Sequence, residues 1–213
     1  MGIKSILSDI RTDKKFIESL PNINSDEFDK VILTRRSIRV FTDENIPKFI
    51  INNSLDNALK APTSSNLQTW EIYCVKSKEI KKKVVKACLS QPAAATAKEL
   101  FVFVSRPDYW KRNNQMMVEY LNSKKNPPKE VLKYYNKFTK IAYTQGFLNI
   151  FGLLKKIYIS IVGMYKVIPR EPTSFNDMKV WSQKTTALAC QNFMLSMRAY
   201  GFDTCPMEGF DSY

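Results

Sequence analysis

Apolar residues recur at helical spacing over the first third of the chain. In residues 3–20 they form one stripe, which predicts an N-terminal helix packed as an arm. Ser25 is placed to cap a second helix, which then ends at Arg35. Pro47 suits the first turn of a third helix, and Pro62 stops it. The predicted buried face of that third helix comprises Ile50, Ile51, Ser54, Leu55, Ala58 and Leu59.

Two short apolar stretches predict strands. Residues 70–75 alternate between apolar and more polar side chains, as in a strand whose two faces differ. Residues 100–104 are apolar throughout, which predicts a central strand buried on both faces. The helical pattern of residues 79–89 connects these strands, and Val40-Phe41 predicts a further short extended piece. The chain is therefore expected to form a sheet covered by helices, in an α+β fold.

Beyond Pro107 the pattern is mainly helical. Residues 111–122 and 129–143 predict two helices, with a break at Pro127-Pro128. Ser174 or Asn176 can cap a last long helix, which Gly201 ends. The apolar positions of that helix are broadly spread, over Trp181, Thr185, Leu188, Cys190, Phe193, Met197 and Tyr200.

Length and composition favour one well-buried domain, because 213 residues with 44% hydrophobic content are short for two. The four cysteines are far apart and histidine is absent, which argues against a zinc site and excludes histidine-based triads. No secretory leader follows Met1, so reduced thiols and a cytoplasmic location are expected. The cysteines are Cys74, Cys88, Cys190 and Cys205.

The formal net charge of +13 raises nucleic acid or an anionic membrane as partners. The lysines fall in several separate segments, and no recognised nucleic-acid motif accompanies them. A solvated basic surface without a specific nucleic-acid partner is the favoured interpretation.

A basic segment follows the second predicted helix. It contains Arg35, Arg36 and Arg39 together with the hydroxyl of Ser37. Arginine presents a planar fork of N–H donors that matches phosphate oxygens, so the segment is a candidate phosphate site. By itself, the same cluster also fits a solvated helix end.

Two other segments carry polar groups in predicted turns. Residues 61–70, Ala-Pro-Thr-Ser-Ser-Asn-Leu-Gln-Thr-Trp, offer hydroxyls and amides that can hydrogen-bond a polyol or the edge of a heterocycle. Residues 205–211, Cys-Pro-Met-Glu-Gly-Phe-Asp, predict a turn in which Gly209 takes a positive φ. Each segment alone is also ordinary loop chemistry.

In order and spacing, the three segments resemble the FMN-dependent nitroreductases, whose members begin with an Arg-x-Ser-x-Arg/Lys segment and continue through a helix to a Pro-Ser-Ser-x-Asn-x-Gln-like loop. The resemblance covers about residues 25–211. It implies one nitroreductase-like domain over residues 1–213, with an N-terminal helical arm at 1–24 and a central, mostly antiparallel sheet covered by helices. It also implies a homodimer with composite cofactor sites, in which the last long helix packs at the centre. The alternative for that helix is an ordinary core position. Residues 107–170 correspond to a helical excursion near the substrate face of the flavin, which is expected to set substrate choice.

The resemblance assigns roles to individual residues. Arg35, Arg36 and Ser37 would hold the phosphate and ribityl side of FMN, and Arg39 would approach the N1/O2 edge and favour the anionic reduced flavin. A backbone N–H of Glu208 or Gly209 would reach N5. Contacts with the FMN of the other subunit are expected from Pro62, Thr63, Ser64 and Asn66, and further cofactor contacts from Gln68, Gln91, Pro206, Met207, Glu208 and Gly209. Arg39, Glu208 and Gly209 would tune the flavin, and no catalytic side chain and no metal are expected.

The implied reaction is the reduction of a small acceptor, such as a nitroaromatic compound or a quinone, by NADH or NADPH. Donor and acceptor would occupy one site alternately, in a ping-pong hydride mechanism carried by the flavin. Two alternatives of other classes remain. The chain could bind or sequester flavin without useful turnover, or it could be a basic module that binds a membrane surface or nucleic acid.

The segment 146–166 is nearly free of charge on both sides of Lys155-Lys156. Spanning a bilayer is disfavoured, since two central lysines would cost about 2.5 to 3.5 kcal/mol each and neither flank approaches about 20 residues. Peripheral contact at the headgroup boundary is one alternative. The other is a helix buried against a dimer partner or over the cofactor.

The family usually continues beyond the position matching Tyr213, through a helix, a strand and a basic phosphate contact. The C-terminal strand is therefore expected to be missing from this chain.

Overall fold

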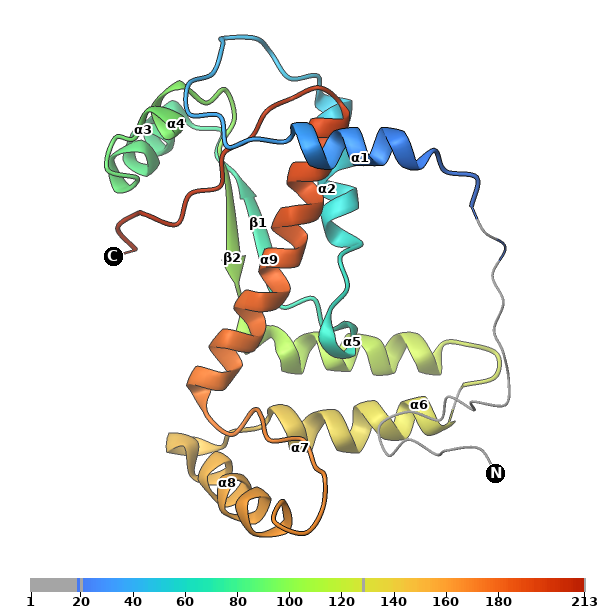
Figure 1. Cartoon of the computed structure of the whole chain (residues 1–213). Helices are drawn as coiled ribbons and strands as arrows, with labels where there is room; N and C mark the ends of the chain where they lie inside the picture. Colours follow the sequence, from blue (N-terminus) through green and yellow to red (C-terminus); the bar gives the residue numbers. More distant parts are fainter. Residues whose placement is uncertain (1–18, 20, 128, 213) are drawn as a thin grey trace. The chain divides into compact units, whose positions relative to one another are not determined.

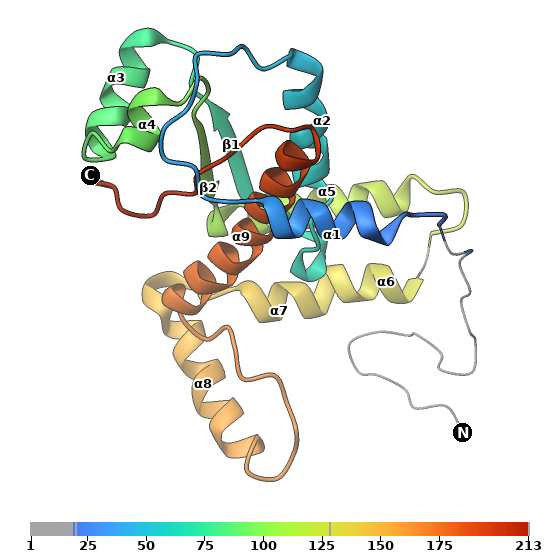
Figure 2. The ribbon, with the colours of Figure 1, turned by 45° about the horizontal axis from the view of Figure 1, so that its top comes forward.

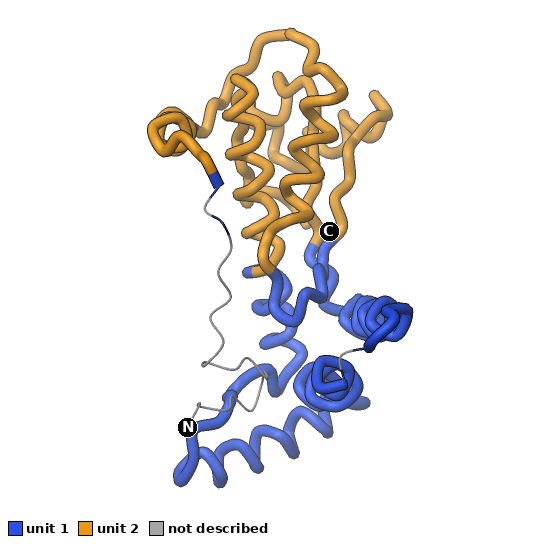
Figure 3. Tube along the Cα trace, turned by 90° about the vertical axis from the view of Figure 1, so that its right-hand side faces the viewer, with its two compact units in different colours: residues 1–21, 63–70, 105–184 blue, residues 22–62, 71–104, 185–213 orange. Residues whose placement is uncertain are grey.

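The computed structural model describes residue 19, residues 21–127 and residues 129–212 (Figure 1). The described chain divides into two compact units (Figure 3). Unit 1 is built mainly from residues 63–70 and 105–184, and unit 2 from residues 22–62, 71–104 and 185–212. The single-domain prediction stays a prediction. The helix expected at residues 3–20 lies almost wholly outside the described residues.

Unit 2 begins with α1 (Ser25–Thr34), which carries the basic segment at its end. The cap of α1 is Asn24, whose side-chain oxygen accepts a hydrogen bond from the backbone N–H of Asp26 at 3.0 Å. The prediction that Ser25 caps this helix is therefore wrong by one residue, because both residue types can supply the acceptor. The predicted end is confirmed, since Arg35 is the C-cap residue.

The second helix of unit 2 is α2 (Lys48–Leu59). Its N-cap residue is Pro47, whose carbonyl accepts the N–H groups of Ile50 and Ile51. The predicted apolar face is largely confirmed, because Ile50, Ile51, Ser54 and Ala58 are buried. Leu59 departs from it with 47% of its surface exposed.

The sheet of unit 2 consists of two strands in the described residues, β1 (Trp70–Cys74) and β2 (Phe101–Ser105). They run antiparallel, since Val75 donates to the carbonyl of Leu100 at one end and Arg106 donates to that of Thr69 at the other. Both strands lie where the pattern predicts them. The prediction of a central strand buried on both faces is wrong here, because β2 has one described neighbour and Val102 remains 38% exposed.

Helices cover both sides of this small sheet. Figures 1 and 2 show α3 (Lys78–Ala87) and α4 (Pro92–Thr96) on one side of the strands, and α2 and α9 (Phe175–Ala199) on the other. On α9, Phe193 is buried, and its ring centroid lies 4.8 Å from that of Phe101 and 5.7 Å from that of Phe103. Aromatic packing thus joins the sheet to α9.

The predicted long helix is α9. Ser174 caps it, because the Ser174 hydroxyl accepts the N–H of Asp177 at 3.1 Å, while the Asp177 carboxylate accepts the N–H of Ser174 at 3.0 Å. This reciprocal pair is a capping box. Asn176, the alternative cap, lies inside the helix. Gly201 follows with a φ of 84°, as expected at a helix end, whereas Leu188 is 46% exposed instead of buried.

Unit 1 is helical. It contains α5 (Trp110–Asn122), α6 (Lys129–Lys133), a π-helical turn (Tyr134–Phe138), α7 (Thr139–Tyr143), α8 (Ile150–Val162) and the start of α9. The helices predicted over 111–122 and 129–143 are confirmed, with the π-helical turn inside the second. The core comprises Leu67, Trp110, Leu121, Tyr135, Tyr143 and Met178.

A membrane-crossing helix is not found in the described part of the chain, where each helix is too short or too polar to span a bilayer.

Candidate functional site

The basic segment leaves α1 in unit 2 with its first two arginines in different environments. Arg36 turns back on the helix end, where its Nη1 atom donates to the carbonyls of Leu33 at 2.5 Å and of Arg35 at 2.9 Å. Arg35 is half-buried, and its Nη1 atom is buried without a hydrogen-bond partner among the described residues. A buried guanidinium donor left unpaired is costly, so this atom is suited to an external acceptor.

The segment then pairs with the chain after α9. Ser37 forms an isolated parallel β-bridge with Thr204, and the N–H of Ile38 donates to the Thr204 carbonyl at 3.3 Å. This bridge replaces the extended piece predicted at Val40-Phe41, where Val40 lies in a bend. The Oγ1 atom of Thr204 is also buried, again without a hydrogen-bond partner in the described chain. Two buried polar atoms of this region therefore lack a partner within the part of the chain that the structure describes. One is Nη1 of Arg35, a cation two residues before Ser37, and the other is the hydroxyl of Thr204, the residue that pairs with Ser37.

Arg198 holds the two sides of this bridge together. From the last turn of α9, its Nε atom donates to the Thr34 hydroxyl at 2.9 Å and its Nη1 atom to Asp203 at 2.8 Å. Thr34 ends α1 just before the basic segment, and Asp203 precedes Thr204. The sequence analysis missed Arg198, although a basic residue one turn before a helix-ending glycine is a signal for such a role.

The chain beyond Thr204 runs on to α3 and α4. Gln91, the N-cap residue of α4, donates from Nε2 to the Gly209 carbonyl at 2.7 Å, and Asp211 donates from its backbone to the Ala87 carbonyl at 2.8 Å. The backbone N–H groups of Glu208 and Gly209 make no hydrogen bond within the described residues. They are therefore available as donors, as the predicted contact with a ligand requires.

The predicted conformation of Gly209 is wrong. Its φ lies outside the left-handed region, and an added Cβ would meet only the Gln91 amide nitrogen, at 3.7 Å. Neither backbone strain nor crowding within the described chain demands a glycine there. The turn instead closes through the Phe210 N–H, which donates to the Glu208 carbonyl at 3.1 Å.

The second polar segment lies in unit 1, apart from Ala61 and Pro62, which belong to unit 2. Its hydroxyls bond tyrosines of the helical excursion. The Ser64 hydroxyl is 3.1 Å from the Tyr143 hydroxyl, and the Ser65 hydroxyl is 2.7 Å from that of Tyr134 and 3.1 Å from that of Tyr143. Burial raises the pKa of Tyr143, which keeps its phenol protonated as a possible donor to these serines.

The rest of this loop is held by local contacts. The Thr63 hydroxyl accepts the N–H of Gln68 at 3.2 Å, and the Asn66 amide lies 3.7 Å from the Met117 sulfur. Ser65, Asn66 and Gln68 all have positive φ angles. Positive φ is unfavourable for residues other than glycine and is concentrated at functional sites. The tyrosine contacts were not predicted, because periodicity shows only that such residues lie on a helix.

The structure therefore gathers the sequence-predicted residues into two groups. In unit 2, the basic segment with Arg35, Arg36, Ser37 and Arg39 is joined to Gln91 and to Pro206, Met207, Glu208 and Gly209 through the chain that follows Thr204. In unit 1, the group consists of Thr63, Ser64, Asn66 and Gln68. Arg39, Pro206, Glu208 and Gly209 are exposed.

Comparison with known proteins shows what the chain resembles. A model of the nitroreductase family matches residues 32–213. The 4-nitrobenzoate reductase of Pseudomonas putida is 26% identical over 190 residues, which cover 87% of this chain and 74% of that protein.

Two solved structures share the fold. A proposed NAD(P)H:FMN oxidoreductase from Staphylococcus epidermidis has a TM-score of 0.63 and 23% identity, over 92% of this chain and 79% of that one. A proposed nitroreductase from Exiguobacterium sibiricum, solved in complex with FMN, has a TM-score of 0.58 and 23% identity, over 86% of this chain and 75% of that one.

Proposed function

The chain belongs to the nitroreductase family, and from that premise we propose that it binds FMN and uses NADH or NADPH to reduce a small acceptor such as a nitroaromatic compound or a quinone. The names of the relatives support this class of reaction, because they include a 4-nitrobenzoate reductase and an NAD(P)H:FMN oxidoreductase. One structural neighbour of the same fold was solved with FMN.

The observation that carries the proposal is that two buried polar atoms have no partner in the described chain: Nη1 of Arg35, two residues before Ser37, and Oγ1 of Thr204, the residue that pairs with Ser37. The phosphate of FMN is an anion with several acceptor oxygens, and a guanidinium donor and a hydroxyl are groups that bind it. The residues present therefore fit this cofactor. A phosphate suits the Arg35 donor better than a neutral acceptor does, because a hydrogen bond between two charged groups is the stronger one.

The other predicted residues have complementary tasks. Arg39 is exposed on the same segment and would place a positive charge where reduction adds a negative one. The free N–H groups of Glu208 and Gly209 would donate to the isoalloxazine ring, and Gln91 fixes their segment through the Gly209 carbonyl. FMN, when bound, supplies the hydride chemistry, so no protein nucleophile is required.

The proposal includes a homodimer in which Pro62, Thr63, Ser64 and Asn66 of one subunit complete the site of the other. The bonds from Tyr134 and Tyr143 support a preformed loop, because they fix the serine hydroxyls before a ligand arrives. A preordered loop loses less conformational entropy on binding.

A flavin titration followed by reduction tests the proposed function. The purified chain should bind FMN, and the flavin absorbance should bleach on addition of NADH or NADPH under anaerobic conditions and return on addition of a quinone or nitroaromatic. Failure to bind FMN would refute the proposal. Binding without reduction by either nicotinamide would instead favour the alternative of a flavin-sequestering protein.

A further inference from the structure

The apolar stripe of α8 faces away from the rest of unit 1. Its side chains recur at spacings of three and four residues, so they share one face of the helix. Each is at least half exposed, from 50% for Ile157 to 64% for Tyr158. We call this the α8 face; it consists of Ile150, Leu153, Leu154, Ile157, Tyr158 and Ile161.

The opposite side of α8 is fixed to unit 1 by polar and close contacts. Lys155 donates from Nζ to the carbonyls of Ile141, Ala142 and Pro172, at 2.7 to 3.3 Å. Gly152 is buried, and a Cβ there would collide with the Thr173 carbonyl. The helix thus turns a lysine inward and its apolar stripe outward, the reverse of an ordinary surface helix.

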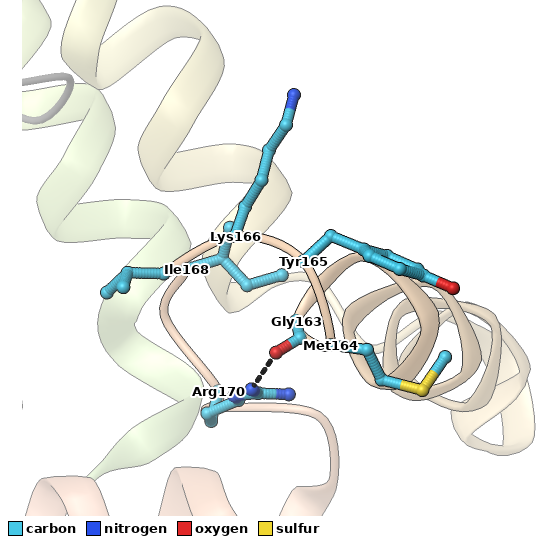
Figure 4. Close-up of a pocket in the computed structure, with 7 residues that line it drawn as sticks. Gly163, Met164, Tyr165, Lys166, Ile168 and Arg170 are labelled. Atoms are coloured by element: carbon cyan, nitrogen blue, oxygen red, sulfur yellow. Dashed lines mark hydrogen bonds between the residues drawn. The ribbon is translucent and has the colours of Figure 1, made fainter.

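The apolar exposure continues past both ends of α8. Phe147 and Leu148 precede the helix, and Tyr165 and Val167 follow it, all strongly exposed, with Val167 at 98%. The loop after the helix closes around a hollow of about 320 Å³ (Figure 4). Arg170 holds this loop by donating to the carbonyls of Ile159 and Gly163, and Lys166 extends away from Arg170.

The sequence on both sides of α8 is basic. Residues 131–170 contain seven lysines and arginines and no aspartate or glutamate. Over residues 105–184 there are fifteen basic and five acidic residues, a formal net charge of +10 out of +13 for the chain. Most of the net positive charge of the chain therefore lies in unit 1.

We propose that the α8 face lies on the surface of an anionic lipid bilayer, with its apolar side chains at the headgroup boundary and exposed lysines of residues 131–170 on the headgroups. Exposed aliphatic and aromatic side chains flanked by cations are the combination that binds such a surface. Pairing of two α8 faces in a second copy of this chain is less favourable, because it would bring two acid-free basic stretches together. The contact is peripheral, since α8 is too short to cross the bilayer.

Vesicle sedimentation tests this proposal on the full chain. The protein should sediment with vesicles of phosphatidylglycerol and phosphatidylcholine in equal parts, and much less with phosphatidylcholine alone. Ile157→Glu should weaken the partitioning by about tenfold or more, because it replaces an apolar contact with the bilayer by a charge that the headgroups repel. High salt should also weaken binding.

The matched control is Ile80→Glu, the same substitution at a residue that is 53% exposed on α3 in unit 2. Circular dichroism checks that both variants are folded. The proposal is overturned if the native chain ignores anionic vesicles or if Ile157→Glu binds them as well as Ile80→Glu does. It is equally overturned if Ile157→Glu abolishes self-association in sedimentation velocity and leaves vesicle binding unchanged, which would assign the face to a second copy. Because FMN content is not the readout, this outcome is independent of the proposed reaction.

Discussion

The side-chain amide of Gln91 donates to the carbonyl of Gly209 at 2.7 Å, across 118 positions of sequence. This contact joins the start of α4 to the segment that is proposed to contact the flavin. Together with the bond from the Asp211 N–H to the Ala87 carbonyl, it holds the backbone of this segment in place, while the N–H groups of Glu208 and Gly209 make no hydrogen bond within the described residues. Gln91 is therefore a residue that positions the segment.

Replacing Gln91 tests this relationship. Gln91→Ala should weaken FMN binding by up to about tenfold, because a neutral hydrogen bond contributes about 0.5 to 1.5 kcal/mol. Flavin fluorescence titration measures the loss. Asn53→Ala is the control, since Asn53 makes a comparable exposed bond to the Tyr200 hydroxyl at 3.1 Å in the same unit. Equal losses of FMN affinity in the two variants would show that Gln91 does not position the segment for FMN.

Much of the fold follows from local sequence chemistry. The positions of β1, β2, α2, α5 and α9 agree with the hydrophobic pattern, and the Ser174 cap follows from a hydroxyl placed three residues before an acidic side chain. Asn24 and Ser25 show the limit of such reasoning. Both can cap a helix, and the choice depends on backbone geometry that the pattern does not contain.

The candidate site was predicted less completely, because its supporting contacts are long-range. The motifs identify Arg35 and Ser37, but not Thr204, which pairs with Ser37 from the other end of the chain. Tyr134 and Tyr143 could be placed on a helix but not against the serine loop. The prediction that β2 is buried on both faces was wrong for a related reason, because the burial of a strand depends on how many strands lie beside it.

The two adjacent arginines of the basic segment should differ in their effect on FMN binding. Arg35→Met should weaken it by about tenfold to a hundredfold, corresponding to about 1.5 to 3 kcal/mol for a charged hydrogen bond. Arg36→Met should weaken it less, because the Arg36 guanidinium is already bonded to two carbonyls. FMN titration at low and high salt measures the affinity of both variants, and the difference between their affinities should decrease as the salt concentration rises. A larger loss for Arg36→Met would reverse the assignment.

Arg198 should support the site without contacting the ligand. Arg198→Met removes the bonds to Thr34 and Asp203 and should lower the unfolding free energy by about 1 to 2 kcal/mol, since the pair is only partly buried. FMN affinity should fall with it, and Arg198→Lys should restore part of both, because an ammonium can replace one of the two bonds. Lys83→Met, at an exposed ion pair with Glu79, should change neither quantity.

Lys155 should make stability depend on pH in the alkaline range. Burial lowers the pKa of Lys155 from 10.5 to about 8, although the charge of Asp177 opposes the shift. Between these values the unfolded chain binds more protons than the folded one, so the contribution of Lys155 to the unfolding free energy rises as pH increases from about 8 to about 10.5. Denaturant unfolding of the native chain and of Lys155→Met should show a difference that grows over this range. The control is Lys156→Met, which removes the neighbouring lysine of the same helix, one that is exposed.

Replacing glycine by alanine should affect the unfolding free energy differently at Gly209 and at Gly152. Gly209→Ala should leave the unfolding free energy nearly unchanged, because the new Cβ meets only the Gln91 nitrogen at 3.7 Å and the φ angle suits any residue. Gly152→Ala should destabilise unit 1, by about 1 to 3 kcal/mol, because its Cβ collides with the Thr173 carbonyl. Since the folded chain tolerates this methyl group, FMN titration of Gly209→Ala measures only its effect on flavin binding. A folded variant with weakened binding means that the flavin occupies the space beside Gly209, since nothing in the described part of the chain opposes the added methyl group. Unchanged affinity would place the flavin elsewhere.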